Sequence, residues 1–248
     1  MISFDREQRF IVTGASSGIG EGVALLLNEL GATVIGIGRN QERLDAMKAK
    51  AKNPDAVFTE AKDLTEDIEN LPLYVKELKN KYGKFQGMAL CAGISATEPL
   101  QAVDLSSLKR MFDIDYFSPI FMTKGFVDRR NNNGKGSAIV AISSIGGIVC
   151  EKGMTAYSGA KAALAASLKT IARETAVQGV RVNSISPSLI QTPMLKDASN
   201  NDYLETSLSK YPFGFGSVSD AANLIVFLLS DKAEWITGQN YILDCGTY

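Results

Sequence analysis

The sequence predicts an α/β fold with one doubly wound parallel sheet of about seven strands and helices on both faces. Two observations predict it. Short apolar runs that resemble strands alternate along the chain with stretches whose apolar residues recur at helical spacing. The chain has 248 residues, 45% of them hydrophobic and 21% charged, which suits one large core. No internal repeat, low-complexity tract or linker interrupts this pattern, so we expect residues 1–248 to form a single domain.

The predicted elements follow one another in a regular order. Strands are expected at residues 10–12, 33–38, 56–60, 87–91, 137–143, 180–185 and 240–243. Helices are expected at residues 21–30, 41–52, a stretch running towards 81, 105–130, 156–177 and 221–230. Pro119 lies inside the stretch 105–130 and predicts a kink or a break there. Residues 196–216 mix aromatic and charged residues irregularly, so we expect a lid over a site at about 189–216.

The charge balance argues against two classes of partner. The net charge is −1, so no electrostatic footprint for nucleic acid or for a membrane surface is present. Residues 1–9 are polar and lack the apolar core of a signal peptide. The most apolar segment, residues 221–229, is too short to span a bilayer.

Histidine is absent from the sequence, which restricts the chemistry. A Ser-His-Asp hydrolase, a histidine general base and the common zinc sites are excluded, and no metal is expected. The three cysteines, Cys91, Cys150 and Cys245, have neither metal nor redox spacing. A reducing cytoplasm is therefore the simplest setting.

A glycine loop joins the first predicted strand to the first predicted helix. It reads Thr13-Gly14-Ala15-Ser16-Ser17-Gly18-Ile19-Gly20. Gly14 permits a turn that a side chain would block, while Gly18 and Gly20 let the backbone approach a pyrophosphate. The helix that follows offers unpaired N–H groups and a partial positive charge. The loop predicts a dinucleotide-binding site, although a structural turn with incidental glycines would look the same in isolation.

The end of the second predicted strand indicates which dinucleotide binds. Arg39 follows Gly38 at the point where the adenosine ribose should lie. An acidic residue there would bind a free 2′-hydroxyl, whereas Gly38 leaves room for a 2′-phosphate and Arg39 supplies a forked cation. The pattern favours NADP over NAD. The alternative is a solvated arginine that opens the next helix.

A serine, a tyrosine and a lysine form the candidate catalytic set. Tyr157 and Lys161 are four residues apart, hence neighbours on one helix face. An ammonium fixed beside a phenol favours the phenolate and lowers its pKa, which makes a tyrosine usable as a general acid or base at neutral pH. Ser144 follows the fifth predicted strand and could donate a hydrogen bond to a substrate oxygen beside Tyr157.

These motifs together resemble the short-chain dehydrogenase/reductase family, from residue 10 to residue 246. The resemblance implies a Rossmann-type fold and a hydride transfer in which Tyr157 is the acid or base and Lys161 also bonds the nicotinamide ribose. It implies that Asp63 and Leu64 contact the adenine and that the small residues Ala92 and Gly93 let the cofactor pass close to the protein backbone. It also implies that Ile190 and Thr192, in the segment that begins at Pro187, contact the carboxamide and the phosphates. Asp63 could equally be the N-cap of the helix running towards residue 81.

Three positions depart from the family pattern. Cys91 stands where the family usually has asparagine, and we interpret it as a small buried hydrophobe rather than a reactive thiol. Ser188 replaces the usual glycine after Pro187. Asp115 stands where the family carries a catalytic-site asparagine. We expect this position to act through its backbone carbonyl, which would hold a water linked to Lys161. That water would end a proton relay that runs from Tyr157 through the nicotinamide ribose and Lys161. The alternatives are that the Asp115 carboxylate itself faces this relay, or that it only makes a local hydrogen bond in the helix.

The resulting functional hypothesis is an NADP-dependent oxidoreductase acting on a small-molecule carbonyl or secondary alcohol, with a 3-oxoacyl thioester as one candidate. Sugar, polyol and steroid dehydrogenases share the motifs, and a non-catalytic dinucleotide sensor is the alternative of another class. An acyl carrier protein is a possible acidic partner, for which Arg129, Arg130 and Lys135 could supply a basic patch. The resemblance also implies a homo-oligomer, a dimer or tetramer, in which the helices at 105–130 and 156–177 pair between subunits and the last strand adds contacts. The alanines of the helix at 156–177 would allow close approach of a second subunit; the alternative is that they simply pack on the sheet.

Overall fold

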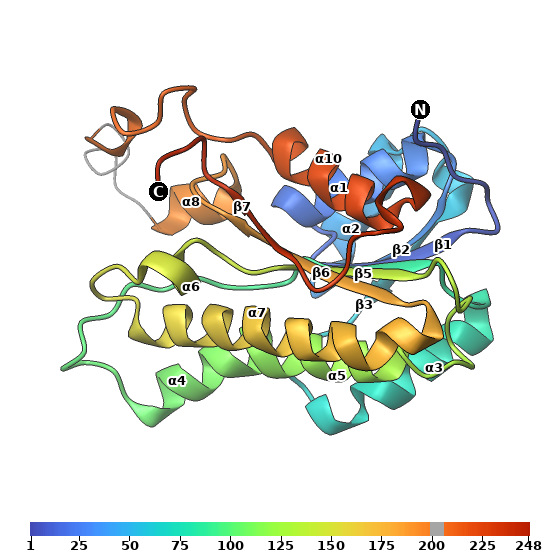
Figure 1. Cartoon of the computed structure of the whole chain (residues 1–248), viewed down its shortest axis with the longest axis horizontal. Helices are drawn as coiled ribbons and strands as arrows, with labels where there is room; N and C mark the ends of the chain where they lie inside the picture. The colour runs from blue at the N-terminus through green and yellow to red at the C-terminus, as the bar shows by residue number, and fades with distance from the viewer. Residues whose placement is uncertain (199–205) are drawn as a thin grey trace.

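A seven-stranded parallel sheet forms the centre of the protein (Figure 1). The structure is a computed structural model that describes residues 1–198 and 206–248, so part of the expected lid lies outside the described residues. The strand order is β3-β2-β1-β4-β5-β6-β7, and every pairing is parallel. The strands are β1 (Arg9–Thr13), β2 (Thr33–Gly38), β3 (Val57–Ala61), β4 (Gly87–Leu90), β5 (Ala138–Ile142), β6 (Arg181–Pro187) and β7 (Asn240–Leu243). The predicted fold class and all seven predicted strands are confirmed.

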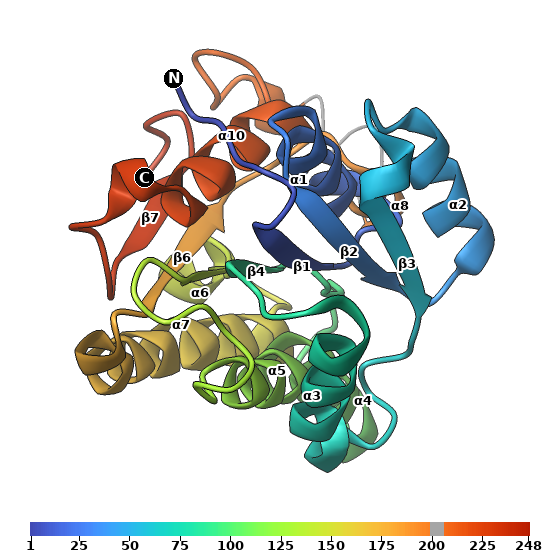
Figure 2. The ribbon, with the colours of Figure 1, turned by 90° about the vertical axis from the view of Figure 1, so that its right-hand side faces the viewer.

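Two layers of helices cover the sheet, one on each face (Figure 2). The first layer contains α1 (Gly18–Glu29), α2 (Gln41–Lys50) and α10 (Val218–Leu229). The second layer contains α3 (Leu71–Tyr82), α4 (Leu105–Phe112), α5 (Ser118–Phe126) and α7 (Thr155–Thr175). Each layer encloses its own apolar core, because the strands direct alternate side chains to opposite faces. Within the described residues, no helix is long and apolar enough to cross a membrane.

The strand order reverses direction between β1 and β4. β1 pairs with β2 on one side and with β4 on the other, so the connections on its two sides lead away from each other. In open α/β sheets, ligands bind in the crevice that forms at this point outside the carboxyl ends of the strands. The hydroxyl of Thr13 bridges this point, since it accepts hydrogen bonds from the N–H groups of Cys91 and Ala92, at 3.0 and 3.1 Å.

The predicted long helix at residues 105–130 is interrupted, as Pro119 suggested, but not by a simple kink. A π-helical segment, Asp113–Phe117, joins α4 to α5 directly before Pro119. Pro119 lies in the first turn of α5 and has no N–H to donate to the backbone hydrogen bonds of a continuous helix. The wider turns of the π-helical segment accommodate this missing hydrogen bond. The side chain of Asp115 is fully buried within this segment.

The segment after β6 begins with a short helix, α8 (Pro193–Ala198). Its described ends are joined to each other, because Ile190 and Gly216 form an isolated parallel bridge. Gln191 N–H donates to the Gly216 carbonyl at 2.8 Å, and Gly216 N–H donates to the Leu189 carbonyl at 3.0 Å. The segment therefore leaves the sheet and returns to it at one place, beside the carboxyl end of β6.

Candidate active site

A cleft of about 800 Å³ opens at the carboxyl ends of the strands. Every sequence-predicted site residue lines it except Asp115, which lies buried behind its wall. The lining residues that the sequence singled out are Gly14, Ser16, Ser17, Gly18, Ile19, Gly20, Arg39, Asp63, Leu64, Ala92, Gly93, Ser144, Tyr157, Lys161, Pro187, Ile190 and Thr192. The fold thus brings together residues from seven separate stretches of the chain.

The glycine loop lies at the middle of the cleft, at the end of β1. Gly14 has φ +68°, and a Cβ there would lie 2.8 Å from the backbone nitrogen of Ala92. A Cβ on Gly20 would collide with the carbonyl oxygen of Gly14. Only glycine fits either position, so the loop packs tightly against the ends of β1 and β4 and directs the amino end of α1 at the cleft. This cradle suits a pyrophosphate.

Three cationic side chains lie around the end of β2, the strand next to β1 and its glycine loop. Arg39, Arg43 and Lys62 all line the cleft, and the side chain of Arg39 is 72% exposed. Arg43 lies in the first turn of α2 and Lys62 directly after β3. We predicted only Arg39 from the sequence. Arg43 lies in the first turn of the helix that follows Arg39 and could have been found from that place, whereas Lys62 needed the parallel pairing of β2 with β3.

Asp63 lies beside this cluster with its side chain turned to its own loop. Its carboxylate accepts hydrogen bonds from the N–H and the hydroxyl of Thr65, at 2.9 and 2.7 Å. Burial works against ionisation, but these bonds and the nearby Arg39 hold the pKa of Asp63 below its ordinary value. The alternative role of Asp63 as an N-cap is wrong, because the next α-helix begins eight residues later, at Leu71.

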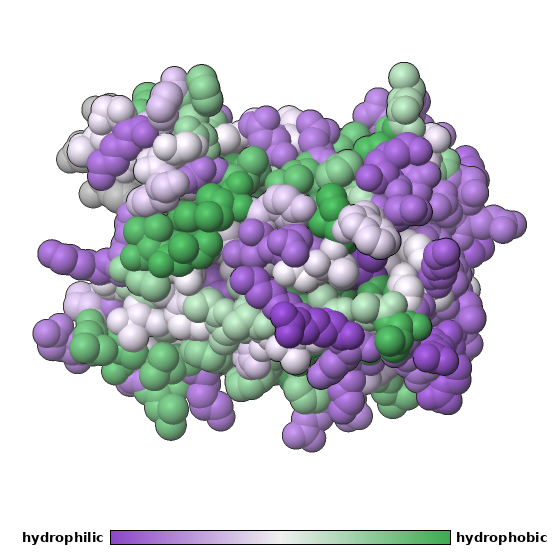
Figure 3. All heavy atoms as spheres, viewed as in Figure 1, coloured by the Kyte–Doolittle hydropathy of each residue, from purple (hydrophilic) through white to green (hydrophobic). Residues whose placement is uncertain are grey.

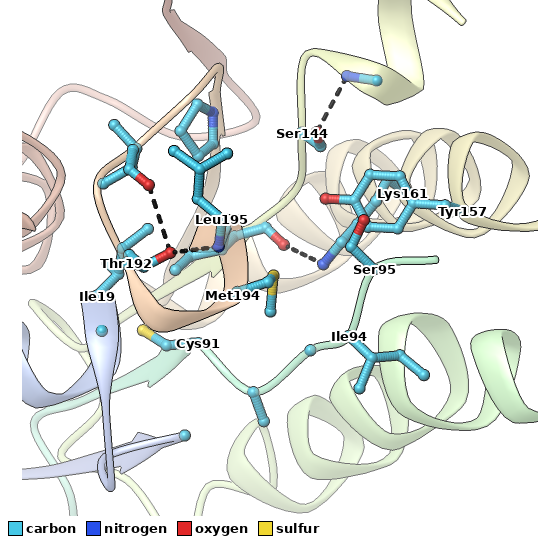
Figure 4. A pocket seen from close by; sticks show the side chains of 18 of the residues that line it. Ile19, Cys91, Ile94, Ser95, Ser144, Tyr157, Lys161, Thr192, Met194 and Leu195 are labelled. Atoms are coloured by element: carbon cyan, nitrogen blue, oxygen red, sulfur yellow. Dashed lines mark hydrogen bonds between the residues drawn. The ribbon is translucent and has the colours of Figure 1, made fainter. Parts of the chain in front are cut away.

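Ser144 and Tyr157 face one space at the other end of the cleft, from the end of β5 and the first turn of α7 (Figure 4). The Ser144 Oγ accepts a hydrogen bond from Gly146 N–H at 3.0 Å, so its own proton stays available for a ligand. A Cβ on Gly146 would lie 3.2 Å from the Tyr157 ring and 3.3 Å from Ser144 Oγ. A glycine at this position therefore lets the two groups approach each other.

Lys161 is buried below Tyr157 and is held at two points. Its Nζ donates to the Ile142 carbonyl at 3.0 Å and forms an ion pair with Asp115 Oδ1 at 2.9 Å. The same Nζ lies 5.8 Å from the centre of the Tyr157 ring. Burial disfavours the ammonium, but the Asp115 carboxylate together with Tyr157 and Cys91 outweighs this effect, so the pKa of Lys161 lies above its ordinary value. The lysine is thus a fixed cation next to the phenol.

The expectation that Asp115 acts through its backbone carbonyl is wrong. Its carboxylate points at Lys161 directly and is also within reach of the Ile94 N–H, at 3.3 Å. A Cβ on Gly93 would lie 2.6 Å from Asp115 Oδ1, so this glycine makes room for the carboxylate. Burial raises the pKa of Asp115 even though Lys161 opposes this shift. The sequence could not reveal the contact, because a regular helix through Pro119 would turn this side chain differently.

Cys91 behaves as the sequence suggested. It is half-buried beside the first apolar core, and burial raises the pKa of its thiol to about 12. A thiol with that pKa is not a nucleophile at neutral pH.

The cleft therefore suits a nicotinamide dinucleotide, whose pyrophosphate would lie near the glycine loop and whose reacting ring would lie near Tyr157. The comparisons with known proteins agree. A family model described as enoyl-(acyl carrier protein) reductase matches residues 14–248. The 3-oxoacyl-[acyl-carrier-protein] reductase FabG of Thermotoga maritima is 33% identical over 246 residues, covering 95% of this chain and 96% of its own.

Two solved structures share the architecture. A dehydrogenase/reductase from Sinorhizobium meliloti 1021 has a TM-score of 0.90 and 26% identity, covering 99% of this chain and 96% of that one. A 7α-hydroxysteroid dehydrogenase, complexed with NADH and 7-oxo glycochenodeoxycholic acid, has a TM-score of 0.90 and 25% identity, covering 97% and 94%. The chain belongs to the short-chain dehydrogenase/reductase family and is an oxidoreductase that acts on CH–OH or carbonyl groups.

Proposed function

We propose that the protein is an NADP-dependent reductase of a small-molecule ketone, with a 3-oxoacyl thioester as the first substrate to test. The observation that carries the proposal is the arrangement of one cleft. It holds a glycine cradle at its middle, three cations at one end, and Ser144 with Tyr157 at the other. The whole chain would serve as one catalytic domain. All three thiols are unpaired, which supports the cytoplasm as its setting.

The proposed chemistry assigns each polar group one task. When bound, NADPH supplies the hydride to the carbonyl carbon. Ser144 and Tyr157 donate hydrogen bonds to the carbonyl oxygen, and these bonds strengthen as negative charge develops on it. Tyr157 then transfers its proton to that oxygen. The ammonium of Lys161 stabilises the phenolate that remains, and Asp115 holds that ammonium in place. Oxidation of an alcohol follows the same path in reverse.

The preference for NADP is supported by Arg39, Arg43 and Lys62. Three cations at one site suit the doubly charged 2′-phosphate, and Gly38 keeps the space before Arg39 open. The carboxylate of Asp63 is engaged with Thr65, so it is not directed at a ribose hydroxyl as the acidic residue of an NAD enzyme would be.

A 3-oxoacyl thioester is the first choice of substrate because the FabG relative from Thermotoga maritima covers almost the whole chain. Sugar, polyol and steroid ketones are the alternatives, and a steroid dehydrogenase shares the fold at 25% identity. The description of the matching family model adds an enoyl thioester, whose C=C bond would be reduced instead of a C=O bond. All of these substrates belong in one panel.

The basic patch considered for an acyl carrier protein lies at the amino ends of the strands, opposite the cleft. Arg129, Arg130 and Lys135 are on the connection from α5 to the start of β5, while the cleft is at the carboxyl ends of the strands. Arg130 is also paired with Asp128, at 2.6 Å. The cations that line this chain's own cleft near the lid are Arg110, Lys152 and Lys210.

We also propose a homo-oligomer, either a dimer or a tetramer. The strand β7 is at the edge of the sheet, and apolar side chains gather on the surface over β7 and α8 (Figure 3). Ile242 of β7 is 48% exposed and Met194 of α8 is 43% exposed. Apolar groups on an exposed edge strand suit a contact with a second copy. Light scattering that shows a monomer at micromolar concentration would contradict this proposal.

One experiment tests the function. NADPH oxidation is measured with a 3-oxoacyl thioester, the matching enoyl thioester, a sugar ketone and a steroid ketone, for the wild type and for Tyr157→Phe. We expect turnover of at least one carbonyl substrate and its loss in the variant. If NADPH binds but no substrate of the panel is turned over, the protein is a dinucleotide-binding sensor and the proposal is wrong.

A further inference from the structure

Two hydroxyl groups form a short hydrogen bond on the wall of the cleft. Ser188 Oγ and Tyr211 Oη are 2.6 Å apart, and both residues line the cleft. Ser188 directly follows the last residue of β6, and Tyr211 comes from the returning part of the segment 189–216. Ser188 is also one of the departures from the family pattern, which usually has a glycine there. The pair is therefore a feature of this chain rather than of the fold.

Both partners are held firmly by their surroundings. Ser188 N–H donates to the Leu243 carbonyl of β7 at 2.9 Å, which fixes the backbone beneath its side chain. The Tyr211 side chain is almost buried, since the residue is 8% exposed, and its ring packs edge-on against Phe215 with the centres 5.3 Å apart. The pair is thus preorganised and does not need to form when a ligand arrives.

The pair lies on the catalytic side of the cleft. Ile145, the residue after Ser144, donates its N–H to the Pro187 carbonyl at 3.1 Å. The backbone that carries Ser188 is therefore directly bonded to the loop that carries Ser144. The three cations of the proposed 2′-phosphate site belong to β2, β3 and α2, on the far side of the sheet order. A ligand group that meets the pair is consequently part of the substrate and not of the adenosine half.

Counting hydrogens shows what the pair offers. Each hydroxyl has one proton, and one of the two protons is used in the bond between them. The other proton is available, and among the described residues neither hydroxyl has another hydrogen-bond partner. Apolar residues, among them Ile145, Leu189 and Met194, also line the cleft. A donor in such a wall that meets no acceptor when the ligand excludes water costs free energy.

We propose that Ser188 and Tyr211 form a subsite for a second oxygen of the substrate. This inference rests on the proposed function and deepens it. The preferred substrates then carry a carbonyl or hydroxyl oxygen in addition to the ketone that reacts at Ser144 and Tyr157. A site built to donate to such an oxygen discriminates against an analogue that lacks it, because the buried donor is left unpaired.

The test compares two ketones of equal chain length, one a 3-oxo ester and the other a simple ketone. The variants are Ser188→Ala, Tyr211→Phe and the double variant, with Ser188→Thr as the conservative substitution that keeps a hydroxyl. Ser167→Ala is the matched control, because Ser167 forms a comparable pair with Tyr116, at 3.2 Å, outside the cleft. Each single variant should lower kcat/KM for the 3-oxo ester about tenfold, as expected for one lost hydrogen bond.

The kcat/KM values of the variants for the two ketones, taken together, decide whether the pair is a substrate subsite. The double variant should lose little more than either single variant, because the two hydroxyls act as one unit. The simple ketone should change less than about twofold, and Ser188→Thr should retain most activity with the ester. Equal losses for both ketones would show that the pair only ties the lid segment to β6, which overturns the inference. Wild-type rates with the ester in every variant would overturn it as well.

Failure of the proposed function has a different signature. If the wild type oxidises NADPH with neither ketone, ketone binding tests the subsite instead of turnover. Calorimetry then measures the affinity of each ketone for the complex of the protein with NADP. Weaker binding of the 3-oxo ester to Tyr211→Phe than to the wild type, with no change for the simple ketone, would support the subsite. Equal affinities of the ester for the two proteins would overturn it.

Discussion

The two ends of the cleft hold their cations in opposite ways. At the adenosine end, the Arg39 side chain is 72% exposed and its nearest carboxylate oxygen is 4.0 Å away, on Asp63. At the catalytic end, the Lys161 side chain is 5% exposed and forms an ion pair at 2.9 Å with an Asp115 side chain that is fully buried. An exposed cation stays hydrated and can adapt to a ligand, whereas a buried pair has one geometry and a strong field. Under the proposed function, the protein fixes a cation by burial where bonds change and leaves the cation exposed where it selects the cofactor.

The elements explain this difference. Lys161 projects from the buried face of α7, and the π-helical segment of the neighbouring helix brings Asp115 to meet it. Arg39 and Arg43 project from the end of β2 and from the first turn of α2, where both are exposed, while Lys62, directly after β3, is half-buried. We therefore expect substitutions at the catalytic end to change kcat and its pH dependence, and substitutions at the adenosine end to change cofactor affinity.

The largest effect is expected from Tyr157→Phe. The substitution keeps the ring over Lys161 and removes the proton that the carbonyl oxygen receives. A fall in kcat of at least about a hundredfold is expected, as is usual for the loss of a general acid. The NADPH dissociation constant, measured by titration, should stay within about twofold, because the phenol makes no contact at the adenosine end. Near-normal turnover would refute the role of Tyr157.

Asp115→Asn should produce the next largest effect, in the pH dependence. The carboxylate raises the pKa of Lys161, and Tyr157 and Cys91 are the other titratable groups that act on the lysine. Removing the negative charge lowers that pKa, so the ammonium is lost at a lower pH. The alkaline limb of the kcat profile should move down by about one pH unit, equivalent to about 1.4 kcal/mol. The apparent value belongs to the coupled groups together.

The control for this prediction is Asp113→Asn in the same π-helical segment. Asp113 is only half-buried, so its profile should match the wild type. If Asp115→Asn also gives a wild-type profile, the ion pair has no part in the proton relay, and the backbone of this position would again be the better explanation.

Arg39→Ala should weaken NADPH binding and spare NADH. A charge-assisted hydrogen bond to a phosphate is worth about 1.5–3 kcal/mol, which corresponds to a loss of affinity of about ten- to a hundredfold. Lys48→Ala is the matched control, since Lys48 lies on α2 outside this cleft. Titrations of both cofactors check the prediction. An unchanged ratio of NADPH to NADH affinity in Arg39→Ala would show that the arginine is merely solvated.

Salt should have the smallest effect, and only at the adenosine end. Exposed charges are screened over about 8 Å at physiological ionic strength, whereas buried pairs are screened much less. Raising the salt concentration should increase KM for NADPH by a few fold and leave kcat at saturating cofactor nearly constant. A parallel fall in kcat would mean that the buried pair is accessible to ions, against the comparison drawn above.

The sequence predicted the fold and the cofactor loop well, because both depend on local patterns. Short apolar runs, alternating with helical stretches, located all seven strands. The glycines of the cofactor loop indicated it because the conformation of that loop itself requires glycine. Contacts between distant segments were less accessible. Lys62 joins Arg39 only through the pairing of β2 with β3, and Ser188 meets Tyr211 only through the return of an irregular segment. The direction of the Asp115 side chain depended on a π-helical turn that helical periodicity does not reveal.

The central claim is that this cleft transfers a hydride between a nicotinamide and a carbonyl carbon. The most direct measurement uses NADPH deuterated at the transferring position and follows the label into the product of the best ketone by mass spectrometry and NMR. The proposed function predicts one deuterium on the new carbinol carbon with the wild type, and hardly any product with Tyr157→Phe. With the enoyl thioester as substrate, deuterium on the β-carbon of a saturated thioester and none on any carbinol carbon of the ketone products would contradict it, as would NADPH oxidation without labelled product.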